Sequence, residues 1–283
     1  MTLQDTLLPR RSRALPRLHV SVRPGLTLAL LVLGVVTLWA LVPSAFTGFD
    51  PVAGLPADKL QAPGVAHWLG SDELGRDVLA RLIFGARQSL TGAAVAVAVG
   101  LSVGSALGVL AGSVGGWVEQ AILRLIDVLL SIPALLLSLA LIVILGFGTV
   151  QVAVAVGVTA IAGFARLIWA EVVTVRRSDY VEAAFGSGGR FFAVLWRHVL
   201  PNAVTSVLAY AAIQFGWAIL QISTLGFLGY GAPPPTPEWG LMIAEGRNYM
   251  TTSWWLTLFP GLVVIATVLA TNAVGHALSR RLQ

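Results

Sequence analysis

Long apolar runs alternate with short polar segments along the whole chain. A helix needs about 20 apolar residues to cross the hydrocarbon core of a bilayer. Six runs reach that length, and each is predicted to be a membrane-spanning helix: about 26–46, 88–112, 121–146, 150–170, 204–228 and 255–277. The pattern therefore predicts an all-α polytopic membrane protein with six transmembrane helices.

The polar segments between these runs differ in charge. Most of the 18 Lys/Arg residues fall on one side if the amino terminus is cytoplasmic, whereas the 13 acidic residues divide almost evenly. The positive-inside rule depends on basic residues, so we expect cytoplasmic tails at 1–25 and 278–283 and a cytoplasmic loop at 171–203. External segments are expected at 47–87 and 229–254. The first run is too long for the apolar core of a signal peptide, so we expect it to be retained as a span.

Composition narrows the class further. The 283 residues are 57% hydrophobic and 11% charged, and the mean hydropathy is +0.84. With this topology, the basic pI of 10.4 reflects membrane orientation and does not predict nucleic-acid binding. There is no cysteine, and the four histidines are scattered, so no metal site is predicted. The one lysine, Lys59, follows Asp58, so the chain holds no Walker-type phosphate loop.

Small residues recur at every fourth position of the second run. Gly92 and Ala96 lead into the row Gly100, Gly104, Gly108 and Gly112. Small residues at this spacing allow two membrane helices to approach closely, so we expect the four later glycines to form a packing face inside the bundle. A pore-lining role for this face is the alternative.

A few polar side chains lie within the predicted spans. Asp127 lies about two turns inside the third span, and we expect Arg124, three residues away, to pair with it. The alternative is that Asp127, as an intramembrane carboxylate, lines the translocation path. Gln214 and Gln221 share one face of the fifth span and are candidates either for that path or for interhelical contacts.

The external segments contain two further predicted features. Apolar positions from residue 74 to residue 82 predict a short interfacial helix in the first one, with three arginines facing lipid headgroups: Arg76, Arg81 and Arg87. In the second, a proline-rich stretch precedes three tryptophans that suit the membrane interface: Trp239, Trp254 and Trp255.

The loop after the fourth span predicts two helices separated by a glycine break. Asp179 and Glu182 have the spacing of a helix cap and its reciprocal residue, so a helix should begin at Asp179. The helix should end near Gly188, because glycine favours turns over helix interiors. Pro201 suits the first turn of the next membrane helix.

This loop also resembles a known motif. Glu182-Ala183-Ala184, followed by Gly188 and then by Leu200-Pro201, is similar to the Glu-Ala-Ala coupling loop of permease subunits in bacterial ATP-binding-cassette importers. The resemblance spans residues 25–278 and is closest at 67–90, 180–202 and 226–261. The resemblance is to the second-permease type of the dipeptide, oligopeptide and nickel family. It implies a type I importer permease fold with a core at 88–277 and a cytoplasmic coupling helix.

The same resemblance implies partners and roles. Asp179, Glu182, Ala183, Ala184, Gly188, Leu200 and Pro201 would form the contact with the ATPase. The chain would pair with a related second permease in the bacterial inner membrane, and would work with two ATPase subunits and an external substrate-binding protein. The partner ATPases would use ATP and Mg²⁺, and this chain would bind no cofactor and would not itself be an enzyme.

Three other functions are weighed against a peptide importer. The same importer class could carry nickel or another small solute. A stand-alone secondary transporter would show inverted repeats or broken helices around a charged midplane site, and the sequence shows neither clearly. A membrane-embedded protease would need a nucleophile and a base, and we find no credible pair.

Overall fold

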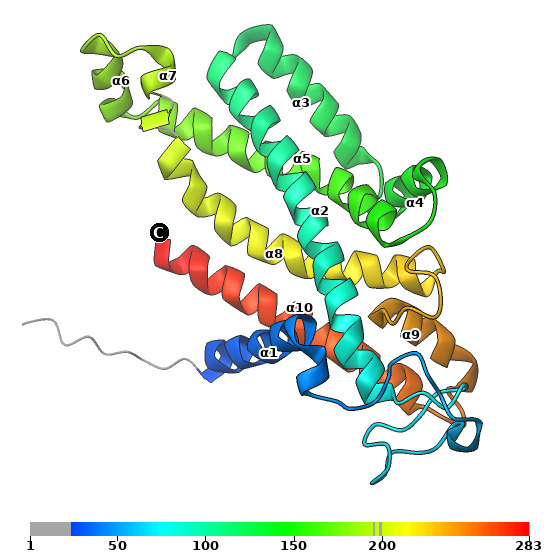
Figure 1. Cartoon of the computed structure of the whole chain (residues 1–283). Coiled ribbons are helices and arrows are strands. Elements are labelled where there is room, and N and C mark those ends of the chain that lie inside the picture. The colour runs from blue at the N-terminus through cyan, green and yellow to red at the C-terminus, as the bar shows by residue number, and fades with distance from the viewer. Residues whose placement is uncertain (1–23, 195, 198–199, 283) are drawn as a thin grey trace, which may run out of the picture.

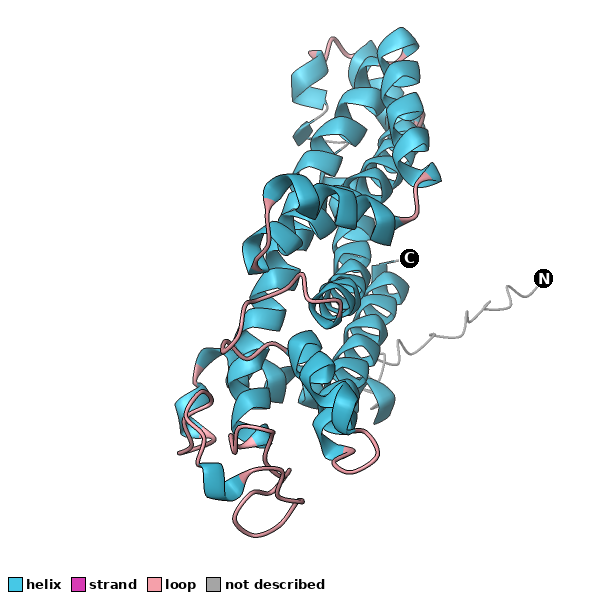
Figure 2. Ribbon diagram, turned by 90° about the vertical axis from the view of Figure 1, so that its right-hand side faces the viewer, coloured by secondary structure: helices cyan, strands magenta, loops and turns pink. Residues whose placement is uncertain are grey.

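In the computed structural model, the described residues are 24–194, 196–197 and 200–282, and they are helical with no strand (Figure 2). The helices are α1 (Pro24–Leu41), α2 (Val78–Val114), α3 (Gly116–Ser131), α4 (Ala134–Leu145), α5 (Thr149–Arg176), α6 (Asp179–Gly186), α7 (Phe191–Val194), α8 (Leu200–Phe227), α9 (Trp239–Gly246) and α10 (Trp255–Leu282). Short 3-10 turns lie at Pro43–Ala45, Pro56–Asp58 and Arg247–Tyr249.

Five of these helices are long and apolar enough to cross a membrane: α1, α2, α5, α8 and α10. The sixth predicted span, 121–146, is not one straight helix. It consists of α3 and α4, which meet at an angle of 96°. Pro133 explains the break, because it has no N–H to donate and disfavours helical geometry at Ile132, which is extended (φ −90°, ψ 128°). Among the described residues there are therefore five spans, or six if the bent pair is one span.

Helix α2 is the centre of the bundle. It makes its most extensive contact with α5 and also packs against α1 and α8. The glycine row lies on the face that meets α5. A Cβ built on Gly104 would lie 2.6 Å from the Cβ of Phe164 and 2.7 Å from the carbonyl oxygen of Ile161, and the other three glycines are similarly close to α5. Side chains of ordinary size do not fit at this crossing.

Figure 1 shows the molecule with two distinct ends. At one end, α6 and α7 project from the bundle; we call residues 176–194 the α6 end. At the opposite end, α9 lies beside the segment of residues 43–77, and together these form the α9 end. Helices α8 and α10 are antiparallel neighbours, because Gly216 faces Thr271 and Gly275 faces Ala209. The start of α8 and the end of α10 therefore share a side of the molecule.

Candidate functional site

The helix predicted from Asp179 is present as α6, and one apolar residue attaches it to the bundle. Val181 is fully buried and packs in a cluster with Val172 of α5, Val194 of α7 and Val207 of α8. On the outer side, Asp179 and Ala183 are exposed, whereas Ala184 is half-buried and packs against the same cluster as Val181. One face of α6 is thus held against three helices while the other is open for contact.

The glycines after α6 end the helix. Ser187 N–H donates to the Ala183 carbonyl at 2.9 Å, and Gly189 N–H donates to the Ala184 carbonyl at 3.0 Å. Gly188 has a φ of +86°, in the left-handed region that other residues rarely adopt. Helix α8 then begins at Leu200, with Pro201 in its first turn. The side chains of Glu182, Leu200 and Pro201 lie outside the described part of the structure.

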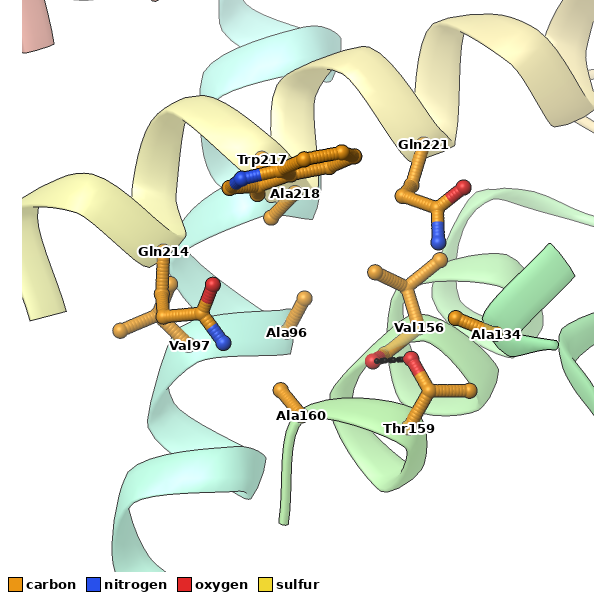
Figure 3. Close-up of a pocket in the computed structure, with 10 residues that line it drawn as sticks. All are labelled: Ala96, Val97, Ala134, Val156, Thr159, Ala160, Gln214, Trp217, Ala218 and Gln221. Carbon is orange, nitrogen blue, oxygen red and sulfur yellow. Dashed lines mark hydrogen bonds between the residues drawn. The ribbon is translucent and has the colours of Figure 1, made fainter. Parts of the chain in front are cut away.

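The two glutamines of α8 line one cavity of about 160 Å³. Figure 3 shows Gln214 and Gln221 pointing from α8 into the space between α8 and α5, where Thr159 of α5 also lies, with Trp217 on the same stretch of α8. Ala96 and Val97 of α2, Ala134 of α4, Val156 and Ala160 of α5 and Ala218 of α8 complete the lining. The lining of this cavity carries amide and hydroxyl groups but no charged side chain.

The predicted pair between Asp127 and Arg124 is wrong. Asp127 instead pairs with Arg166 of α5, whose Nη2 lies 3.0 Å from the Asp127 Oδ1, and both side chains are 53% exposed. The reason is the packing of α3 on α5: the neighbouring Ile126 is buried in a cluster with Ala162 and Ala165. That contact brings together the residues that follow Ile126 and Ala165, namely Asp127 and Arg166.

A buried ion network at the α9 end overturns the expectation that Arg76 and Arg81 face lipid headgroups. The two arginine side chains are 2% and 1% exposed. Arg76 Nε lies 2.6 Å and Arg81 Nη1 lies 2.8 Å from the same oxygen of Asp72, and Arg81 Nη2 lies 2.9 Å from Glu245 Oε2 of α9. Burial raises the pKa of Glu245, and Arg81 and Arg76 partly offset this. The network fastens segment 43–77 to α9.

No separate interfacial helix forms in this segment. Residues 71–77 form turns and a single bridge between Ser71 and Asp77, and the Asp77 carboxylate caps α2 by accepting from Ala80 N–H. Helix α2 then runs without a break from Val78. Arg87, in contrast to the two buried arginines, is exposed, and it donates to the carbonyls of Ala40 and Leu41 at the end of α1.

Glu238 was not singled out from the sequence, yet it is one of the most buried charged residues. Its carboxylate caps α9 by accepting from Gly240 and Leu241 N–H, both at 2.9 Å, and Ser89 of α2 lies 3.4 Å away. Burial raises the pKa of Glu238 above its ordinary value of 4.5, against the lowering effect of these hydrogen bonds. An acidic residue directly before an apolar helix is the signal that could have found it.

Two of the three predicted interface tryptophans are interior residues. Trp239 is fully buried, and its indole N–H donates to the Leu82 carbonyl at 3.0 Å. Trp255 is 5% exposed and donates to the Ser71 carbonyl. Both rings are covered by the start of α2 and the segment before it. Trp254 is 50% exposed and is still suited to the interface.

Residues 104–283 match the family described as "Binding-protein-dependent transport system inner membrane component". The chain belongs to this family. It is therefore a permease component of a transport system and not the ATP-hydrolysing enzyme of that system.

Several relatives in this family have names that specify a solute. The chain is 38% identical, over 93% of its length and 86% of the relative's, to "Glutathione transport system permease protein GsiD" of Pectobacterium atrosepticum. It is 34% identical to "Dipeptide transport system permease protein DppC" of Alkalihalophilus pseudofirmus, over 79% and 73% of the two chains. It is 37% identical to "Probable D,D-dipeptide transport system permease protein DdpC" of Escherichia coli K12, over 81% and 77%.

A solved structure supports the fold. The chain described as "Crystal structure of an amino acid ABC transporter with histidines" superposes with a TM-score of 0.54 at 15% identity. The match covers 68% of this permease and 90% of that chain. The predicted all-α importer permease fold is thus confirmed.

Proposed function

We propose that this permease is one of two membrane subunits of an ATP-driven importer for dipeptides or short oligopeptides. The observation that carries the proposal is the identity of 34–38% to permeases named for dipeptide and glutathione transport, over most of each chain. Glutathione is itself a small peptide, so these relatives share a solute class. A related second permease and an external substrate-binding protein complete the membrane part of the complex.

In this proposal, α6 is the contact with an ATPase subunit. It projects at one end of the bundle, its outer face is exposed, and Val181 fixes it to α5, α7 and α8 (Figure 1). A displacement of α6 is therefore transmitted to the helix that carries Gln214 and Gln221. Asp179, Glu182, Ala183, Ala184 and Gly188 form the contact, and Leu200 and Pro201 begin the helix that receives the motion.

ATP and Mg²⁺ act only through the partner ATPase subunits. ATP binding can move the permease only by stabilising one of its states more than the other. The α6 end lies in the cytoplasm in this account, together with the end of α10, which shares a side with the start of α8. The basic residues of the predicted cytoplasmic loop support this orientation.

Solutes pass along the face of α8 that lines the cavity. Side-chain amides and a hydroxyl suit the amide groups of a peptide, since each amide both donates and accepts hydrogen bonds. Gln214 and Gln221 are thus assigned to the path. The second permease would supply the opposite wall.

Co-purification tests the proposal. A tagged permease expressed with its neighbouring genes should bring down two ATPase subunits and a second permease. The double variant Glu182→Arg, Gly188→Trp should lose the ATPase subunits but keep the second permease. Arg190→Gln, an exposed change in the same loop, is the matched control and should keep both. Repeated isolation of the wild-type chain without any ATPase would refute the proposal.

A further inference from the structure

The ion pair between Asp127 and Arg166 lies at a depth where an exposed charge needs a reason. Asp127 is six residues, about 9 Å, inside the predicted span 121–146, and Arg166 is four residues, about 6 Å, inside the predicted span 150–170. The hydrocarbon core is about 30 Å thick, so both groups lie inside it, in its cytoplasmic third. Both side chains are nevertheless 53% exposed in the isolated chain.

Hydrocarbon is a poor environment for this pair. Charged side chains within a membrane span are unfavourable, and those that occur face a bundle interior or a water-filled cavity. Pairing removes only part of the free-energy cost of placing these charges in hydrocarbon, because about half of each side chain is not covered by protein. The surface that bears Asp127 and Arg166 therefore does not face lipid in the assembled transporter.

The helix geometry connects the pair to the cavity. Arg166 is seven residues after Thr159, so the two lie on the same face of α5, two turns apart. Gly163 lies between them on that face and is directed at Tyr210 and at Gln214 of α8, whose Nε2 would be 3.7 Å from a Cβ at this position. The face of α5 that lines the cavity thus continues to Arg166.

We propose that Asp127 and Arg166 line the water-filled path on the α6 side of the cavity and contact the charged termini of the peptide. This inference rests on the proposed function for its substrate class. A free peptide carries an ammonium group, which suits the Asp127 carboxylate, and a carboxylate, which suits the planar fork of Arg166. The two glutamines contact the amide groups, and the ion pair opens to receive the ends.

Water access is the direct test, and the chain is well suited to it because it has no cysteine. Ser131 is exposed and lies one turn after Asp127 on the same face of α3, so Ser131→Cys leaves the ion pair intact. The control is Leu31→Cys in α1, which is 62% exposed and faces lipid in this account. A membrane-impermeant cationic methanethiosulfonate is applied to the complete complex in membranes.

The expected result is labelling of Ser131→Cys at least about tenfold faster than that of Leu31→Cys, since these reagents need a hydrated thiolate. Labelling no faster than the control would overturn the proposal. The assay does not depend on the solute, whereas wild-type dipeptide uptake, measured alongside, tests the proposed function. A failure of this inference is therefore distinguishable from a failure of the proposed function.

Neutralising both charges tests the contact with substrate. Asp127→Asn with Arg166→Gln keeps the size and polarity of the pair, and should lower the uptake rate at saturating binding protein about tenfold, as expected for lost hydrogen bonds to charged groups. The half-saturating peptide concentration should be unchanged, because the binding protein sets it. An unchanged rate would overturn the substrate contact. Loss of the second permease on purification would also overturn the proposal, because the pair would then belong to the subunit interface.

Discussion

Gly104→Ala is the simplest perturbation of the crossing between α2 and α5. The added methyl carbon would lie 2.6 Å from the Cβ of Phe164, 2.7 Å from the Ile161 carbonyl oxygen and 3.1 Å from the Ala165 nitrogen. Two of these three atoms are backbone, so no side-chain rotation relieves the contact. Overpacking of this kind costs about 1–3 kcal/mol, which corresponds to roughly 5- to 150-fold in the ratio of folded to unfolded chain.

The assay is thermal or detergent-induced unfolding of the purified complex, with Gly34→Ala as the matched control. Gly34 is also in a membrane helix, α1, but no atom lies within 4 Å of a Cβ built there. The control should therefore change stability by a few tenths of a kcal/mol at most, or slightly stabilise α1, since alanine is the better helix former. Equal effects of the two substitutions would refute the argument that the glycine row is needed for close packing.

Three further predictions concern the two ends of the molecule. Arg81→Leu leaves Arg76 alone to neutralise Asp72 and Glu245 and should destabilise the fold by about 1–3 kcal/mol, whereas Arg87→Leu, which removes an exposed side chain, should change the unfolding midpoint little; equal shifts would contradict the network. Because the pKa of Glu238 is raised above 4.5, its contribution to stability is fully present below pH 4.5 and is lost as the pH rises through the folded-state pKa. Over that window the wild-type melting temperature should fall relative to that of Glu238→Gln, and parallel pH profiles would exclude this role. Val181→Ala removes buried apolar volume worth about 1–2 kcal/mol at ~0.8 kcal/mol per methylene and should weaken ATPase co-purification, whereas Val65→Ala, at a position 99% exposed, should not.

Periodicity and small-residue spacing were sufficient to predict the membrane helices and α6. These signals are local, because each lies within a few residues of the element that it predicts. They are an apolar run of sufficient length, the cap spacing at Asp179 and the glycine at position 188. The break between α3 and α4 was also local. Pro133 was visible in the sequence, but a hydropathy pattern does not show where an apolar run stops being helical.

Long-range pairing accounts for what the sequence did not predict. Arg81 and Glu245 are separated by 164 positions, and the sequence contains no signal that the second would neutralise the first. Without that partner, a basic residue next to an apolar run is expected to face headgroups. Arg166 similarly replaced Arg124 as the partner of Asp127 because α3 packs on α5. Such contacts depend on how the helices are arranged in three dimensions.

The most direct test of the central claim is uptake of a radiolabelled dipeptide by cells that lack this gene, complemented by the wild-type chain or by Glu182→Arg, Gly188→Trp, with labelled nickel run in parallel. We expect dipeptide uptake to be lost on deletion and restored by the wild type but not by the double variant, although that variant still reaches the membrane. Dipeptide uptake that is unaffected by the deletion, or full uptake by the double variant, would contradict it.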